Sequence, residues 1–339
     1  MLSKRIDFLG YRVPVLVPVA LGLALIAWMY LSTRPKVRVP LTSTTIEVGD
    51  NPQTLGFGPL GLWVAHGGDE TLQQIEPGSG DTGEAVPLET LPGGIVVTEE
   101  AVWVGSIEGR SIVRVVPGGE GADAQVSTVK VGRTPQAIAL GDGSLWVAAF
   151  DDGTIYRVDL TTGEPAGDPI RLQEAFPSSL AYGFNSLWVT DVVDDTLLRL
   201  DESTGEIEQT IAVGDSPTGI AIDDQGVWVA NFNDSTISHI DPDTNAPVGE
   251  AVIVGGKPAG IAAGYGYIWV TRQPKEGEPG DPEERRGSLI RIDPVESEWT
   301  GEVFEVGAAP QGIVIGAGSV WVADQESDTV TRLTPDEGD

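Results

Sequence analysis

The chain has 339 residues, 40% of them hydrophobic and none of them cysteine, so it can bury a large core but excludes disulfides, thiol nucleophiles and cysteine zinc sites. Its formal net charge is −31. Six of its 20 basic residues and one of its 51 acidic residues precede residue 41, so the remainder carries 14 − 50 = −36. A surface of that charge repels phosphate backbones, which argues against nucleic acid as a partner.

An uncharged apolar run of 19 residues occupies positions 13–31. This is close to the ~20 residues that a helix needs to span a bilayer. No small-residue cleavage site follows it, so we expect an uncleaved anchor rather than a signal peptide. Three basic residues lie close to the run on each side, and the free amino terminus favours a cytoplasmic tail. The expected organisation is a tail at 1–12, a transmembrane helix at 13–31 and a stalk at 32–42. The protein is then a single-pass protein of the cell membrane, with the remainder of the chain extracytoplasmic.

Tryptophan recurs seven times in a short strand rich in valine. The fifth unit, residues 217–242, shows the pattern most clearly: PTGIAIDDQGVWVANFNDSTISHIDP. The tryptophans are Trp63, Trp103, Trp146, Trp188, Trp228, Trp269 and Trp321, which by subtraction lie 40, 43, 42, 40, 41 and 52 residues apart. A period of ~40–45 residues built from short strands is typical of β-propeller blades. The sequence therefore predicts an all-β fold, a seven-bladed β-propeller of four-stranded blades over residues 43–336.

The two ends of the repeat region predict how the ring closes. The last unit has strands at residues 311–315, 320–323 and 329–333 and then stops, without a fourth strand. Residues 44–48 match the end of a fourth strand and precede the first unit. We therefore expect residues 44–48 to pair antiparallel with residues 329–333 as the outer strand of the seventh blade, because an open ring would leave exposed sheet edges. The propeller is expected to be monomeric, with residues 337–339 as an acidic end.

A proline precedes the first strand of each unit, and the second strand reads Trp-Val followed by Ala, Thr or Gly. The loop prolines are Pro52, Pro92, Pro135, Pro177, Pro217, Pro258 and Pro310. Over residues 43–336 this pattern resembles the YVTN and NHL families of β-propellers, and within them the streptogramin (virginiamycin B) lyase-like group. For that group the resemblance implies a catalytic histidine after a loop proline and metal-binding glutamates after the aromatic strand. Here no histidine follows a loop proline and no glutamate is third after a tryptophan, so this catalytic pattern is lacking.

Two positions in each unit are expected to line one face of the ring: the residue after the loop proline and the third residue after the tryptophan. From these positions we predict a ligand- or partner-binding site of eight residues: Gln53, His66, Gln136, Asp191, Asn231, Arg272, Gln311 and Asp324. Of the two histidines, His66 is interpreted as a hydrogen-bonded rim residue and His239 as structural. Carboxylate and amide oxygens suit calcium or magnesium, but one ligand per blade places them far apart. A metal is therefore left open, and no cofactor is expected.

Three functions remain open on the sequence alone. The favoured one is a membrane-anchored, extracytoplasmic, non-catalytic module that binds an unknown protein or small molecule. One alternative is a metal-dependent enzyme similar to the streptogramin lyases, and the other is a structural accessory subunit of a membrane complex. The sixth unit contains an insertion at residues 273–288, rich in proline, glycine and charge. It is either a partner contact or a tolerated loop.

Overall fold

The computed structural model describes residues 40–335, except 120–121, 173 and 275–286, together with two short strands near the amino terminus. These strands, β1 (Ile6–Phe8) and β2 (Tyr11–Val13), pair antiparallel and belong to a separate unit, Met1–Pro40 with Asp336–Asp339. The expected transmembrane helix at 13–31 lies outside the described residues, apart from the last residue of β2. So do the stalk up to residue 39 and the acidic end. Within the described part of the chain, no helix is long and apolar enough to cross a membrane.

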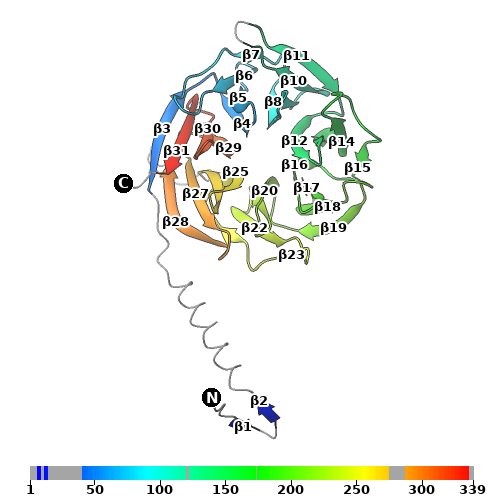
Figure 1. Cartoon of the computed structure of the whole chain (residues 1–339), viewed down its shortest axis with the longest axis vertical. Helices are drawn as coiled ribbons and strands as arrows, with labels where there is room; N and C mark the ends of the chain where they lie inside the picture. The colour runs from blue at the N-terminus through cyan, green and yellow to red at the C-terminus, as the bar shows by residue number, and fades with distance from the viewer. Residues whose placement is uncertain are drawn as a thin grey trace, which may run out of the picture. The chain divides into compact units, whose positions relative to one another are not determined.

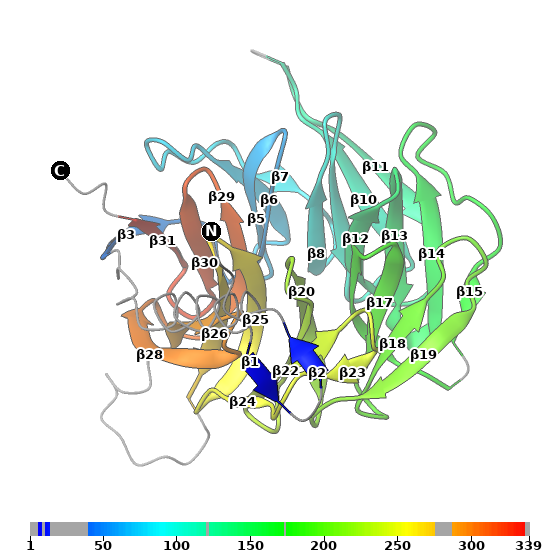
Figure 2. The same ribbon diagram turned by 60° about the horizontal axis from the view of Figure 1, so that its bottom comes forward.

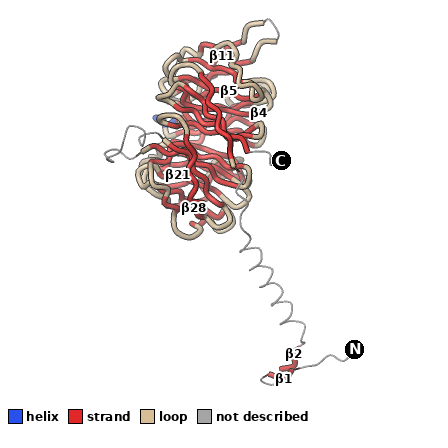
Figure 3. Tube along the Cα trace, turned by 90° about the vertical axis from the view of Figure 1, so that its left-hand side faces the viewer, coloured by secondary structure: helices blue, strands red, loops and turns tan. Residues whose placement is uncertain are grey.

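The unit Leu41–Pro335 consists of seven antiparallel sheets arranged as blades around one axis (Figure 1), which confirms the predicted all-β, seven-bladed propeller. Figure 3, coloured by secondary structure, shows that this unit is built almost wholly of strands and loops. The innermost strands of blades 1 to 7 are β4 (Pro52–Gly58), β8 (Pro92–Val97), β12 (Pro135–Gly141), β16 (Pro177–Gly183), β20 (Pro217–Ile222), β25 (Lys257–Gly264) and β29 (Pro310–Gly316). The second strands, which carry the tryptophans, are β5 (Gly61–His66), β9 (Val102–Ser106), β13 (Ser144–Ala149), β17 (Ser186–Asp191), β21 (Val227–Asn231), β26 (Tyr267–Gln273) and β30 (Ser319–Asp324).

The outer half of each blade is less regular than the inner half. The third strands are β6 (Thr71–Ile75), β10 (Ser111–Val116), β14 (Thr154–Asp159), β18 (Thr196–Leu200), β22 (Thr236–Asp241), β27 (Ser288–Asp293) and β31 (Thr329–Pro335). The outermost strands are β7 (Val86–Pro87), β11 (Gln125–Lys130), β15 (Ile170–Arg171), β19 (Ile207–Ala212), the pair β23 (Ala246–Pro247) and β24 (Val252–Ile253), β28 (Glu298–Glu305) and β3 (Leu41–Glu47). A short 3-10 turn, η1 (Phe150–Asp152), follows β13.

The hydrophobic core is divided into seven clusters, each of which joins the tryptophan of one blade to the next blade. Trp146 of blade 3 packs against Leu187 of blade 4. Trp321 of blade 7 packs against Leu62 of blade 1. All seven tryptophans are at most 4% exposed. Burial of so large a side chain at every blade boundary makes the ring one cooperative unit, because no blade covers both its faces alone.

The strand β3 supplies the outer edge of blade 7. It pairs antiparallel with β31 from Leu41 opposite Pro335 to Glu47 opposite Thr329. It begins three residues before the expected segment and contributes Ile46, which is 8% exposed, to the cluster that joins blades 7 and 1. The first and last described strands of the propeller therefore share one sheet.

Antiparallel pairing places the connections of every blade on two opposite faces. We call the loop face the one with connections from second to third strands and from outer strands to the next inner strand, such as residues 67–70 and 88–91. The turn face carries the other two connections, such as residues 59–60 and 76–85. Figure 2 shows inner strands β8, β12 and β20 near the axis and β11, β15 and β19 outside them. The pairing of Leu41 with Pro335 places the chain's entry into the ring at the turn face.

Candidate functional site

A β-bulge follows the loop proline of every inner strand. In blade 1 the register shifts between Pro52 and Thr54, so Gln53 is the extra residue. The same kind of shift occurs in the other six blades and includes Gln136 in blade 3 and Gln311 in blade 7. A bulge leaves its extra residue outside the ladder and re-aims the side chain. The three predicted glutamines therefore lie at the loop-face ends of the inner strands.

These glutamines are half-buried, so part of each side chain is accessible at the loop face. The Gln311 side-chain amide donates to Oε1 of Gln325, in the connection after β30, at 3.2 Å. The Gln53 amide lies over Gly67 and leaves no room for a Cβ there. Gly312, beside Gln311, lies against the backbone of Gln53, so blades 7 and 1 bring these two positions together. Gln136 is two blades further along the ring.

The predicted residues third after a tryptophan lie inside the blades, with the exception of Arg272. His66, Asp191, Asn231 and Asp324 are 0%, 3%, 0% and 0% exposed. These four side chains were expected to line the opening of this face, and the structure buries them within the blades instead. The physical reason is that the loop leading into the inner strand covers the end of the second strand. Gly49, Gly214 and Gly307 of these loops lie against His66, Asn231 and Asp324, and the N–H of Phe176 bonds to Asp191. Their contact with a ligand stays a prediction.

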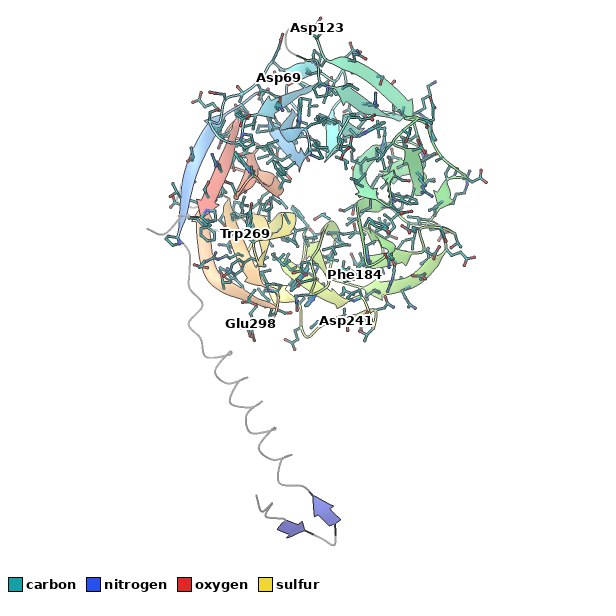
Figure 4. The ribbon with its side chains drawn as sticks, in the orientation of Figure 1. Asp69, Asp123, Phe184, Asp241, Trp269 and Glu298 are labelled. Carbon is teal, nitrogen blue, oxygen red and sulfur yellow. The ribbon has the colours of Figure 1, made fainter. Side chains whose placement is uncertain are left out.

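His66 shows the arrangement most completely. The backbone N–H of Gly49 donates to His66 Nε2 at 3.1 Å, so the ring proton lies on Nδ1, 3.2 Å from the Thr71 hydroxyl. Burial lowers the pKa of His66, and the nearby carboxylate of Asp69, labelled in Figure 4, opposes that shift. A neutral imidazole with both nitrogens bonded fastens the entry loop of blade 1 to its second strand.

Asp191 and Ser106 have the same role in two other blades. Asp191 Oδ1 accepts the N–H of Phe176 at 3.1 Å and the N–H of Val193 at 3.2 Å. The hydroxyl of Ser106 accepts the N–H of Gly109 at 2.8 Å. In each case a buried polar side chain accepts the N–H groups of nearby loop residues. These contacts hold loops of the loop face against the ends of the second strands.

Asn231 and Asp324 form matching arrangements in blades 5 and 7. The Asn231 amide donates to the hydroxyls of Thr236 at 3.0 Å and Ser238 at 2.9 Å. Asp324 Oδ2 accepts from the hydroxyls of Thr329 at 3.2 Å and Thr331 at 2.6 Å. In both residues Oδ1 is buried without a hydrogen-bond partner. Burial raises the pKa of Asp324 to about 6, and its hydrogen bonds only partly oppose that shift.

Arg272 is half-buried and connects two blades. Its Nε donates to the Ser288 hydroxyl at 2.6 Å and its Nη1 to the Val254 carbonyl, at the end of blade 5, also at 2.6 Å. Its guanidinium lies 5.3 Å from the ring centroid of Trp299. The guanidinium that was predicted to contact a ligand thus bonds to groups of blades 5 and 6 at their boundary.

A second repeated feature was not predicted: the third-strand residue directly opposite each tryptophan. In six of the seven blades it lies eleven residues after the tryptophan, a spacing visible in the sequence. These residues are Gln74, Arg114, Arg157, Arg199, His239, Arg291 and Arg332. The five arginines lie 5.1–5.7 Å from the tryptophan ring centroids. His239 stacks on Trp228 at 3.8 Å, and burial lowers its pKa.

Two of these residues also connect neighbouring blades at the turn face. Arg199 of blade 4 donates through Nη1 to the Pro242 carbonyl at 2.6 Å and to Asn245 Oδ1 at 2.8 Å, both in blade 5. His239 Nδ1 lies 2.8 Å from the hydroxyl of Ser297 in blade 6. Their role is to join blades, as the interpretation of His239 as structural implies.

Carboxylates do not gather into a metal-binding group in the part of the ring that the structure describes. No group of three or more His, Cys, Asp or Glu side chains is placed there to hold an ion. Asp191 and Asp324 belong to different blades, and each is bonded within its own surroundings. The connections of the loop face do carry single carboxylates, such as Asp69, Asp152 and Asp234, each of which accepts a backbone N–H of the neighbouring entry loop.

No family profile matches the chain, and no curated protein matches its sequence. Solved structures do resemble it. Virginiamycin B lyase from Staphylococcus aureus is 18% identical, with a TM-score of 0.71 over 87% of this chain and 99% of that one. A streptogramin B lyase is 15% identical, with a TM-score of 0.72 over 87% and 97%. Kuenenia stuttgartiensis hydrazine synthase is 14% identical, with a TM-score of 0.69 over 86% and 98%. At this identity the likeness is one of fold, and the fold hosts different chemistries. The chain is a seven-bladed β-propeller whose structural neighbours include the streptogramin B lyases.

Proposed function

We propose that the protein is a membrane-anchored, extracytoplasmic propeller that binds a ligand or partner protein through its loop face without catalysing a reaction. The observation that carries this proposal is a difference in exposure: three glutamine amides are accessible at the loop face, whereas the histidines, which could act as bases, are buried. The amides of Gln53, Gln136 and Gln311 are partly exposed at the loop face. Both histidines are buried and held by hydrogen bonds.

Amides suit recognition better than acid–base chemistry. Each offers two N–H donors and a carbonyl acceptor and does not titrate near neutral pH. Gln53 and Gln311 lie on neighbouring inner strands, so a single ligand can contact both. The strongly acidic surface around them favours a neutral polar or cationic ligand over an anionic one. Within this proposal Asp191, Asn231 and Asp324 keep the loop face in shape, and they contact the ligand only indirectly.

Replacing Gln53, Gln136 and Gln311 together by alanine is expected to reduce partner capture about tenfold, because an unpaired partner group costs ~1–3 kcal/mol. Tagged full-length protein is used as bait, and captured material is quantified by mass spectrometry. The matched control is Val295→Ser, a change at a 72% exposed residue on the turn face, and it should not alter capture. Capture that survives the triple substitution but requires residues 273–288 would move the site to that insertion. It would also favour the accessory-subunit function.

The lyase alternative is favoured by one observation, the fold similarity to the streptogramin B lyases. It requires a base, and His66 is the histidine nearest the loop face. If the full-length protein opens a cyclic ester in the presence of magnesium, and His66→Ala removes that activity, the non-catalytic proposal is wrong. A loss that follows from a displaced entry loop is recognised by a parallel drop in thermal stability, because His66 accepts the Gly49 N–H.

Membrane anchoring is proposed from the apolar run at 13–31. The chain enters the ring at the turn face, so the loop face is on the side of the ring away from the entry point. A reporter that is active only outside the cytoplasm, fused to the carboxyl terminus, should be active. Protease added to intact spheroplasts should remove the propeller. A protected propeller would show that the basic residues after the run set the orientation.

A further inference from the structure

A second surface lies on the turn face, where blades 1, 2 and 3 meet around a cavity of about 370 Å³. Its lining comprises Pro59, Val97, Thr98, Glu99, Glu100, Leu140, Leu160 and Thr161. Pro59 lies in the first turn of blade 1. In blade 2, Val97 ends β8 and residues 98–100 lie in the turn that follows. Blade 3 contributes Leu140 of β12 and residues 160–161 after β14. Leu140 is 46% exposed at this cavity, so its side chain is accessible to a ligand.

Two of the turns around this cavity are fixed by hydrogen bonds. The Thr98 hydroxyl donates to the Ala101 carbonyl at 2.8 Å, and the Ala101 N–H donates back to it at 3.1 Å. The Asp159 carboxylate accepts the N–H groups of Thr161 at 2.9 Å and Thr162 at 2.8 Å, and these bonds lower its pKa. The cavity is therefore preformed, and a ligand that enters it loses little affinity to ordering the protein.

Its rim is acidic. Glu99 and Glu100 are exposed on the fixed turn of blade 2. The Glu100 side chain is 78% exposed, and the guanidinium of Arg114 is 4.0 Å from its carboxylate. That separation and exposure make a weak ion pair, which leaves most of the negative field directed to solvent. The net charge of −36 beyond residue 40 adds a long-range attraction for cations.

We propose that this pocket binds a cationic peptide segment, which inserts aliphatic side chains between Leu140, Leu160 and Val97 and places lysine or arginine against Glu99 and Glu100. The volume falls within the about 300–1,000 Å³ of small-ligand sites and accommodates two or three aliphatic side chains. Charge complementarity selects the partner: an anionic or neutral segment of the same shape gains no attraction from the rim. The site is separate from the loop-face site and does not depend on it.

The test uses the full-length chain in lipid nanodiscs, so that no free detergent competes for the apolar walls. The probe is a fluorescein-labelled peptide of alternating lysine and leucine, titrated by fluorescence anisotropy at about 0.15 M salt. Its counterpart of alternating lysine and serine has the same charge and no apolar anchor. The lysine–leucine peptide should bind at least about tenfold more tightly than the lysine–serine peptide.

Three variants locate the site. Leu140→Asp and Thr161→Arg, both at exposed positions, should each weaken binding of the lysine–leucine peptide about tenfold, the first by removing the anchor contact and the second by repelling the cation. Phe184→Asp is the matched control: this residue, labelled in Figure 4, lies in the turn between β16 and β17 of blade 4, on the same face of the ring, and is 38% exposed. It should leave binding unchanged.

Equal affinity for the two peptides would overturn the proposal, because it would show attraction to the acidic surface alone. So would equal effects of Phe184→Asp and Leu140→Asp. If Leu140→Asp lowers the melting temperature, its loss of binding cannot be assigned to the pocket, and the result for Thr161→Arg tests the proposal instead. That variant changes only an exposed side chain, because the turn is held by N–H groups that bond to Asp159. Unchanged binding in the Thr161→Arg variant then places the peptide elsewhere.

Discussion

Deleting residues 41–49 is expected to unfold the whole propeller in one transition rather than to loosen blade 7 alone. The deletion removes β3 and its complete register with β31, and it exposes β31 as a bare sheet edge. It also removes Ile46 from the cluster that joins blades 7 and 1. Because every blade is covered only by its neighbours, an opened boundary weakens the entire ring. Urea denaturation followed by tryptophan fluorescence reports this directly, since one tryptophan lies at each boundary.

A matched pair of substitutions separates this effect from a local change. Ile46→Asp places a carboxylate among apolar side chains and is expected to cost about 3 kcal/mol or more, because a buried charge without a partner is strongly destabilising. Thr44→Asp changes an exposed residue of the same strand and should stay within about 0.5 kcal/mol. Two separate transitions after the deletion, or equal costs for the pair, would contradict closure of the ring through β3.

The strands were predictable because their signals are local. The fifth unit's second strand was expected from its tryptophan and β-branched residues, and the structure has it at Val227–Asn231. The outer strands were less predictable: β7 and β15 have two residues each, and β23 and β24 divide one edge between them. Outer strands pack on one side only, so their sequences carry weaker constraints.

The candidate site was only half predictable, because spacing along a strand does not reveal what covers its end. The bulge residues Gln53 and Gln311 were correctly placed on the loop face, since a loop proline fixes where the inner strand begins. Asp191, the third residue after Trp188, was expected on the same face, yet its carboxylate accepts the N–H groups of Phe176 and Val193 and it is buried. The sequence does not distinguish a polar residue at a strand end that is open to a ligand from one that is covered by a loop.

The repeated polar residue opposite the tryptophan, an arginine in five of the seven blades, was visible in six blades as a spacing of eleven residues. The spacing alone did not indicate its contacts. Arg199 acts on Pro242 and Asn245, more than forty positions away in the sequence. Such contacts depend on the angle between blades, which the pattern within one unit does not specify. The same spacing gives His239 its place on Trp228.

Asp324 is expected to make the propeller less stable at neutral pH than at acidic pH, in a window set by its own pKa. Burial raises this pKa from 3.8 to about 6 in the folded ring. The folded state therefore keeps the proton that the unfolded chain loses. The contribution of protonated Asp324 to the free energy of unfolding is therefore fully present below about pH 4 and is lost as the pH rises through about 6. The difference corresponds to about 3 kcal/mol.

Asp324→Asn should therefore stabilise the protein by up to about 3 kcal/mol at pH 8 and hardly at all at pH 4. Asn231 shows that the site accepts an amide: it bonds two hydroxyls in blade 5 as Asp324 does in blade 7, and hydroxyls donate or accept equally well. The reciprocal change, Asn231→Asp, should destabilise at pH 8 and be nearly neutral at pH 4. Free energies of unfolding in urea are compared between variant and wild type at each pH, which cancels the titration of the other carboxylates. If Asp324→Asn shifts stability equally at both pH values, Asp324 is already ionised in the folded ring, and the hydroxyls of Thr329 and Thr331 outweigh its burial.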